Sequence, residues 1–154
     1  RDWSSDVCSS DLLGSHFEGV DSGSRAVTVF VIYGEPMGKP RMTQRDKWAK
    51  RPAVMRYRAW ADAARAAAPA NLPKDPICVS WTAYLPIPKS WSAKKRKAHL
   101  GTLHRSKPDR DNIDKGVLDA LFKSDCGVAG GTLVKRWDDG SGPRIVVKVE
   151  ANLP

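Results

Sequence analysis

The chain has 154 residues, enough for one domain with a hydrophobic core but hardly for two. It carries 26 Lys and Arg against 17 Asp and Glu, a formal net charge of +9, which favours a polyanionic partner such as nucleic acid. The sequence has no run of about 18 or more apolar residues, so we expect no membrane-spanning helix and no membrane partner. The three cysteines have neither zinc-site nor disulfide-framework spacing, so we expect a reduced, cytoplasmic setting.

Residues 1–25 are expected to lie outside the fold, as a disordered or artefactual N-terminal segment. Residues 1–12 (RDWSSDVCSSDL) have no hydrophobic period and no signal-peptide core, and they resemble the translation of a common sequencing adapter. Residues 13–25 are rich in Gly and Ser, which is typical of a flexible lead-in. The domain is therefore expected to span residues 26–154.

The first half of this domain predicts two strands, a basic loop and a helix. Residues 26–33 are β-branched and aromatic, which predicts a strand, and residues 34–50 form a loop with several Lys and Arg. Pro52 suits the first turn of a helix that runs to about Ala68. Its predicted apolar stripe consists of Met55, Ala59, Ala63 and Ala66. Alternating apolar residues at 76–86 predict the second strand.

The second half predicts two helices and two strands. Ser90 is expected to cap a short basic helix over residues 91–100, and a longer helix follows the acidic stretch at 107–119. The core face expected for that helix is Ile113, Val117, Leu118, Leu121 and Phe122. Strands near 132–137 and 144–149 flank an Asp-Asp-Gly-Ser-Gly turn, which predicts a hairpin. The order β-α-β-(α)-α-β-β predicts a single α/β (α+β) domain, a mixed four-stranded sheet with helices packed on it.

The stretch 107–119 (KPDRDNIDKGVLD) holds the candidate catalytic residues. Asp109 and Asp111 are carboxylates one residue apart at the start of the predicted helix, and Lys115 follows four residues later. Carboxylate oxygens suit a hard cation, and a neighbouring lysine suits a phosphate. The pattern therefore indicates phosphate chemistry assisted by a metal ion.

Two structural alternatives explain the same residues. Asp111 or Asn112 could serve only as the N-cap of the helix. Asp111, Lys115 and Asp119 could form an ordinary salt-bridge ladder, worth a few tenths of a kcal/mol. The spacing alone does not decide between these alternatives and a metal site.

The segment KPDRDNIDKGVLDAL resembles the signature of the RusA-type Holliday-junction resolvases, endonucleases that cut four-way DNA junctions. The basic segment 34–41 (GEPMGKPR) is similar to the loop that follows the first strand in that family. The resemblance extends over residues 27–149. It implies Mg-dependent hydrolysis of the phosphodiester bond in recombination and repair, a homodimer, and branched DNA as the partner.

The resemblance also assigns roles. It implies that Asp109 and Asp111 bind Mg²⁺, with Mn²⁺ as the alternative ion, and that Lys115 stabilises negative charge on the phosphate. Asp119 is expected to support the site without binding metal, and Asp114 to be an exposed helix charge.

One departure from the family pattern concerns a further acid about fifteen residues after the motif lysine. Gly130 occupies that position, so the implied metal site lacks its third ligand. Asp125 and Asp138 could replace the acid only with a shift in register. The resemblance therefore implies the fold and DNA surface of the enzyme, with impaired cleavage.

Two basic clusters are expected to bind the DNA backbone irrespective of sequence. The first cluster is Lys39, Arg41, Arg45, Lys47 and Lys50, and the second is Lys89, Lys94, Lys95, Arg96, Lys97, Arg105, Lys107 and Arg110. Trp48 and Trp91 lie in these segments and are expected to pack under loops, although stacking on bases is the alternative. His99 and His104 are expected at the surface and not as ligands.

Three functions are compatible with these features. The first is a junction-cutting endonuclease, the second a junction- or DNA-binding protein without nuclease activity, and the third an RNA-binding domain in which the aspartates are only helix caps.

Overall fold

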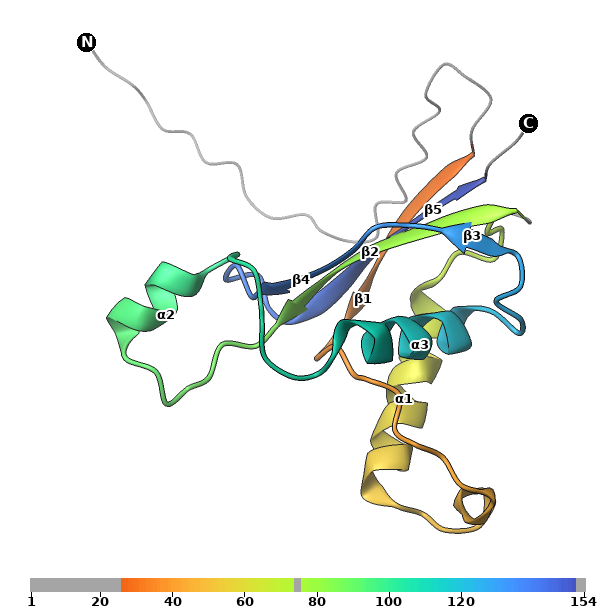
Figure 1. Cartoon of the computed structure of the whole chain (residues 1–154), viewed down its shortest axis with the longest axis horizontal. Coiled ribbons are helices and arrows are strands. Elements are labelled where there is room, and N and C mark those ends of the chain that lie inside the picture. Colours follow the sequence, from red (N-terminus) through yellow and green to blue (C-terminus); the bar gives the residue numbers. More distant parts are fainter. Residues whose placement is uncertain (1–25, 74–75, 152–154) are drawn as a thin grey trace.

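A computed structural model describes residues 26–73 and 76–151, and the predicted N-terminal segment lies outside this part of the chain. The elements in order are β1 (Val27–Tyr33), the 3₁₀ helix η1 (Gln44–Lys47), α1 (Pro52–Ala67), β2 (Ile77–Leu85), α2 (Ala93–His99), α3 (Arg110–Leu121), β3 (Val128–Gly130), β4 (Leu133–Trp137) and β5 (Arg144–Ala151). Figure 1 shows the strands gathered in one sheet, with the helices α1 and α3 on one face.

The strands form one mixed sheet, which confirms the predicted α/β class. β5 lies between β1 and β2 and is antiparallel to both, whereas β3 and β4 pair in parallel with the other edge of β2. The short β3 makes the sheet five-stranded where the sequence predicted four strands.

The predicted hairpin of the last two strands is wrong. β4 and β5 both pair with β2, on its two sides, so the turn at residues 138–142 carries the chain across β2. The residues of this turn encode a chain reversal but do not determine which strand becomes the neighbour. β5 takes a central place because Ile145, Val147 and Val149 must be buried.

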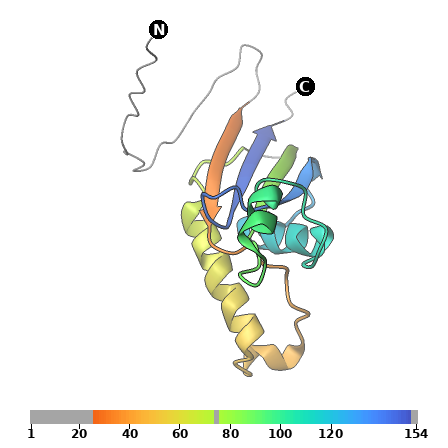
Figure 2. The same ribbon diagram turned by 90° about the vertical axis from the view of Figure 1, so that its left-hand side faces the viewer.

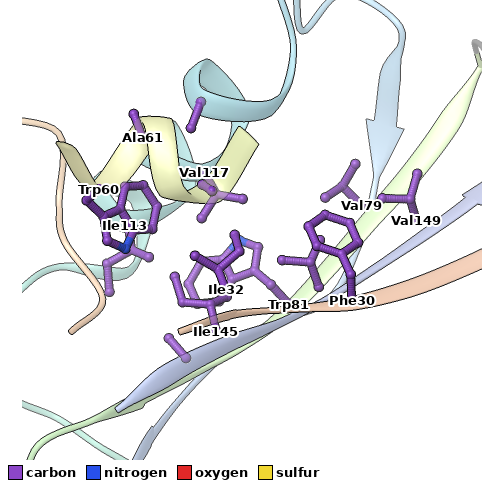
Figure 3. Close-up of a cluster of buried hydrophobic side chains, with 14 of the residues drawn as sticks. Phe30, Ile32, Trp60, Ala61, Val79, Trp81, Ile113, Val117, Ile145 and Val149 are labelled. Atoms are coloured by element: carbon purple, nitrogen blue, oxygen red, sulfur yellow. The ribbon is translucent and has the colours of Figure 1, made fainter. Parts of the chain in front are cut away.

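The hydrophobic core lies between one face of the sheet and the helices α1 and α3 (Figures 2 and 3). The alternation predicted for β2 is confirmed, since every second residue from Ile77 to Leu85 is buried. Trp81 fills the centre of this core, and Ile113 and Val117 of α3 pack above it.

Helix α1 has the predicted length but not the predicted buried face. Met55, Ala59, Ala63 and Ala66 are exposed, and the buried residues are Val54, Tyr57, Trp60, Ala61 and Ala64. Both rows have helical spacing, but Tyr57 and Trp60 bury far more apolar area than alanines do. The aromatic side chains therefore determine the rotation of the helix.

Helix α2 stands apart from the other helices, at the left of Figure 1. None of its residues is buried, and its N-cap is Ser92, whose hydroxyl accepts a hydrogen bond from the Lys95 amide at 3.3 Å, instead of the predicted Ser90. Within residues 26–73 and 76–151, no helix has the length and hydropathy needed to cross a membrane.

Candidate functional site

The candidate catalytic residues lie at the exposed start of α3. Asp109 is the N-cap residue, with its carbonyl accepting a hydrogen bond from the Ile113 amide, so the prediction of Asp111 or Asn112 as the cap is wrong. The Asp109 side chain makes no capping hydrogen bond, and Asp111 lies exposed in the first turn. Capping therefore does not explain the two carboxylates.

The salt-bridge alternative also fails for Lys115. Across the part of the chain that the structure describes, Asp119 pairs with Lys39 of the loop after β1, and no ion pair joins Lys115 to Asp111 or Asp119. A hollow of about 410 Å³ is lined by Lys39, Arg41, Asn112 and Lys115, among others. The structure thus brings two cations of the first basic cluster beside the motif lysine.

This hollow exists because the loop after β1 lies directly against α3. The Lys39 amide donates a hydrogen bond to the Asn112 carbonyl at 3.1 Å. A Cβ atom at Gly116 would lie 3.0 Å from the Met37 carbonyl oxygen, so the close approach depends on glycine in the helix. Sequence analysis did not assign Gly116 a role, although a glycine in a helix interior is itself a signal for close packing.

A buried carboxylate, Asp46, anchors the rest of the loop. Its side chain is only 2% exposed and accepts hydrogen bonds from Arg51 at 2.5 Å and from the Thr43 amide at 2.6 Å. The Arg58 guanidinium donates to the Asp46 carbonyl at 3.0 Å. The bonds to the carboxylate, from Arg51 first and then from Thr43, hold the pKa of Asp46 well below its ordinary value of 3.8.

We expect Asp46→Asn to lower the melting temperature and to loosen the loop that carries Arg45 and Lys47. The variant loses its ion pair with Arg51 and cannot accept all the hydrogen bonds that the carboxylate accepts. The folded state favours the ionised carboxylate, so its stabilising effect is complete above about pH 4 and is lost as the pH falls below the unfolded-state pKa. The difference in melting temperature between the two proteins should accordingly shrink below pH 4.

Asp62→Asn is the matched control for this experiment, because Asp62 pairs with Arg65 on an exposed helix surface. Such surface pairs contribute little to stability. Equal melting temperatures for the Asp46 and Asp62 variants at pH 7 would contradict the anchoring role.

The position at which the resemblance predicts a third acid contains no carboxylate. Gly130 ends β3 at the irregular edge of the sheet, and a Cβ atom there would meet no heavy atom within 4 Å. Asp125 lies exposed ahead of β3. Asp138 is engaged in its turn, where it accepts hydrogen bonds from the amides of Gly140 and Gly142 at 3.2 and 3.0 Å.

The residues present do not complete the metal site that the family resemblance implies. In the described ranges, no three His, Cys, Asp or Glu side chains come together as a metal-binding group. Asp114 also has another role than predicted, because it is half-buried and accepts a hydrogen bond from the Trp81 indole at 2.8 Å. Asp109 and Asp111 therefore remain two carboxylates without a third.

The second basic cluster approaches α3 from α2. Lys94, Lys95, Arg96 and Lys97 are all exposed on α2, and Arg105, Lys107 and Arg110 are exposed along the segment that leads into α3. Lys135 of β4 holds this segment, since its ammonium group donates to the carbonyls of Ser106 and Pro108 at 2.8 and 2.7 Å. In Figure 1 the start of α3 lies between α2 and the loop that carries η1. The exposed cations Lys107 and Arg110 are close to Asp109 in the chain, and Lys39 and Arg41 line the hollow beside Lys115.

Trp48, His99 and His104 differ from expectation, whereas Trp91 packs as predicted. Trp48 is 84% exposed at the end of η1, so the prediction that it packs under a loop is wrong, whereas Trp91 does pack, 5.0 Å from Trp137 between ring centroids. His104 is buried against Trp137, not at the surface, and burial together with Lys135 lowers its pKa. His99 is half-buried beside Trp91. The packing around Trp137 depends on where β4 lies in the sheet, and no local sequence pattern predicts that position.

These features define a small basic α/β domain with an exposed acidic helix end among cations. Comparison with known proteins names the class: the family model for endodeoxyribonuclease RusA matches residues 34–150. The chain therefore belongs to the RusA endodeoxyribonuclease family. It is also similar to an uncharacterized protein of Bacillus subtilis (strain 168), YqaN, with 34% identity over 134 residues that cover 78% of this chain and 93% of that protein.

Proposed function

We propose that this chain recognises four-way (Holliday) DNA junctions as a RusA-type resolvase in recombination and repair, and that glycine at position 130 strongly impairs its strand cleavage. The observation that carries the proposal is the exposed Asp109–Asp111 pair beside Lys115, with basic clusters on both sides. The family membership supplies the reaction class, hydrolysis of a DNA phosphodiester bond.

The two basic clusters are proposed to bind the DNA backbone. Their exposed cations suit phosphates in any sequence, which fits a protein that recognises the shape of a junction. Trp48 lies between Lys47 and Lys50 with its ring free, and we propose that it contacts bases where the junction opens.

The implied cofactor is Mg²⁺, with Mn²⁺ as the alternative. Asp109 and Asp111 are the proposed ligands, but two exposed carboxylates make a weaker and less defined site than three converging ligands. Lys115 is proposed to contact the phosphate next to them. This incomplete ligand set is the reason for proposing impaired cleavage.

We also propose that the active form is a homodimer, because cutting a four-way junction on two strands requires two sites. β1 is an edge strand of the sheet, and its exposed apolar side chains Val29 and Tyr33 are candidates for the interface. Light scattering of the purified chain tests this part, and a monomer at micromolar concentration would contradict it.

Binding to a synthetic four-way junction is expected to exceed binding to a duplex of equal length and to weaken steeply with salt. A protein that contacts six to ten phosphates loses roughly three to five orders of magnitude in affinity between 50 and 200 mM salt. Lys94→Glu should weaken junction binding and reduce the salt slope by about one unit.

Lys148→Glu is the matched control, since Lys148 lies on β5 and pairs with Glu150 away from both basic clusters. Equal losses for the two variants would show that net charge alone matters. Stronger binding to a double-stranded or hairpin RNA than to the junction would favour the RNA-binding alternative.

A further inference from the structure

A second hollow, of about 430 Å³, lies between α2 and β4 and does not belong to the catalytic position. Its lining includes the aromatic residues Trp91 and Trp137, the cations Lys95 and Arg105, and Leu103. The volume falls in the range of pockets that bind small molecules. The hollow therefore combines aromatic, apolar and cationic surfaces in one place.

The aromatic wall is an ordered cluster separate from the main core. The Trp91 and Trp137 ring centroids are 5.0 Å apart, and the Lys95 ammonium lies 4.0 Å from the centroid of Trp91. His104 packs on the other side of Trp137 with a centroid distance of 4.0 Å. Such contacts fix the side chains before any ligand binds.

The segment that carries Leu103 is tied to β4 by backbone hydrogen bonds. The Trp137 amide donates to the Thr102 carbonyl at 2.8 Å, and the His104 amide donates to the Lys135 carbonyl at 3.0 Å. Leu103 lies between these two anchor points, yet its side chain is 68% exposed. These backbone hydrogen bonds thus hold the Leu103 side chain in solvent, where it lines the hollow.

Packing accounts for the buried Trp137 and His104, but it does not account for the exposed cations and Leu103. No residue of α2 is buried, so its cations and Leu103 contribute little to the core. An apolar and aromatic surface beside two cations suits a nucleotide, whose base packs against the apolar surface while its phosphate meets the cations. A paired duplex keeps its bases stacked and cannot offer one to the hollow.

We propose that the hollow between α2 and β4 binds one unpaired nucleotide, with its base against Leu103 and the exposed part of Trp91 and its phosphate between Lys95 and Arg105. The inference rests on the proposed function, because a branched DNA supplies such a nucleotide next to the catalytic position. Arg105 precedes Asp109 by four residues, so the two lie at most about 14 Å apart along the chain. The site therefore selects DNA that has an unstacked base near the point of cleavage.

Leu103→Asp tests the inference, with Leu100→Asp as the matched control. Both leucines are exposed, and the two substitutions introduce the same charge. Leu100, however, is the C-cap of α2 and does not line the hollow. The probes are a labelled twelve-nucleotide oligothymidine, a blunt duplex and a four-way junction, with affinities measured by fluorescence anisotropy. Leu103→Asp should bind oligothymidine about tenfold more weakly than Leu100→Asp, whereas the two variants should bind the duplex equally.

Equal oligothymidine affinities for the two variants would overturn the nucleotide site. If Leu103→Asp melts at a lower temperature than Leu100→Asp, the pair Leu103→Ser and Leu100→Ser gives the same comparison without an added charge. If the wild type prefers the junction but the two variants bind oligothymidine equally, the nucleotide site is refuted and the proposed junction function stands. A difference between the variants without any junction preference supports the site and refutes the proposed junction function.

Discussion

Wild-type protein with Mg²⁺ is expected to bind a synthetic four-way junction and to leave it essentially uncut, whereas Gly130→Asp is expected to cut it at least about a hundredfold faster. Asp109 and Asp111 alone do not form a group of three ligands in the described part of the chain. The family resemblance implies a carboxylate at position 130, and the open space around Gly130 accommodates one without overlap. A well-held metal ion contributes several kcal/mol to the transition state, which corresponds to a factor of a hundred or more.

Gly130→Asn is the control for this prediction, because asparagine has nearly the same shape and no charge. Adding Asp109→Asn to Gly130→Asp should abolish the gained cleavage, and Mn²⁺ binding measured by calorimetry should follow the same order. Cleavage by the wild type at the rate of Gly130→Asp would show that the third carboxylate is dispensable. Junction binding without cleavage in both proteins would instead favour a DNA-binding protein with no nuclease activity.

Gly131→Ala is expected to destabilise the fold by about 3–5 kcal/mol, while Gly130→Ala changes the free energy of unfolding little. Gly131 has a φ of +154°, and a Cβ atom there would lie 1.8 Å from the Val79 carbonyl oxygen of β2. Backbone strain costs about 1–3 kcal/mol, and overlap with a core strand that cannot move freely costs a further 1–3 kcal/mol. The neighbouring Gly130 has neither problem.

Urea unfolding of the two alanine variants measures this difference directly, since they add the same methyl group at adjacent positions. Similar midpoints for both would contradict the close approach of residue 131 to β2. The same geometry restricts where an acid could be restored, because position 130 admits a side chain and position 131 does not.

Several elements were predictable because their signals are local. The alternation of residues 77–85 identified β2 and its buried face, and Pro52 identified the start of α1. The separation of Asp111 and Lys115 from the apolar face of α3 followed from the helical spacing of its residues. The rotation of α1 was predicted wrongly, since two rows of apolar residues compete and burial by the sheet selects the aromatic one.

By itself, the sequence determined the family motif, the α/β class and the strongly basic composition, and it predicted that an acid is missing at position 130. Only the tertiary structure decided that β4 and β5 lie on opposite sides of β2, that Asp46 anchors the loop after β1, and that a hollow lies beside Trp137. The physical reason is the distance along the chain over which each kind of signal acts. Motifs and periodicity act over a few residues, whereas strand order and aromatic clusters depend on which distant segments bury the most apolar surface together.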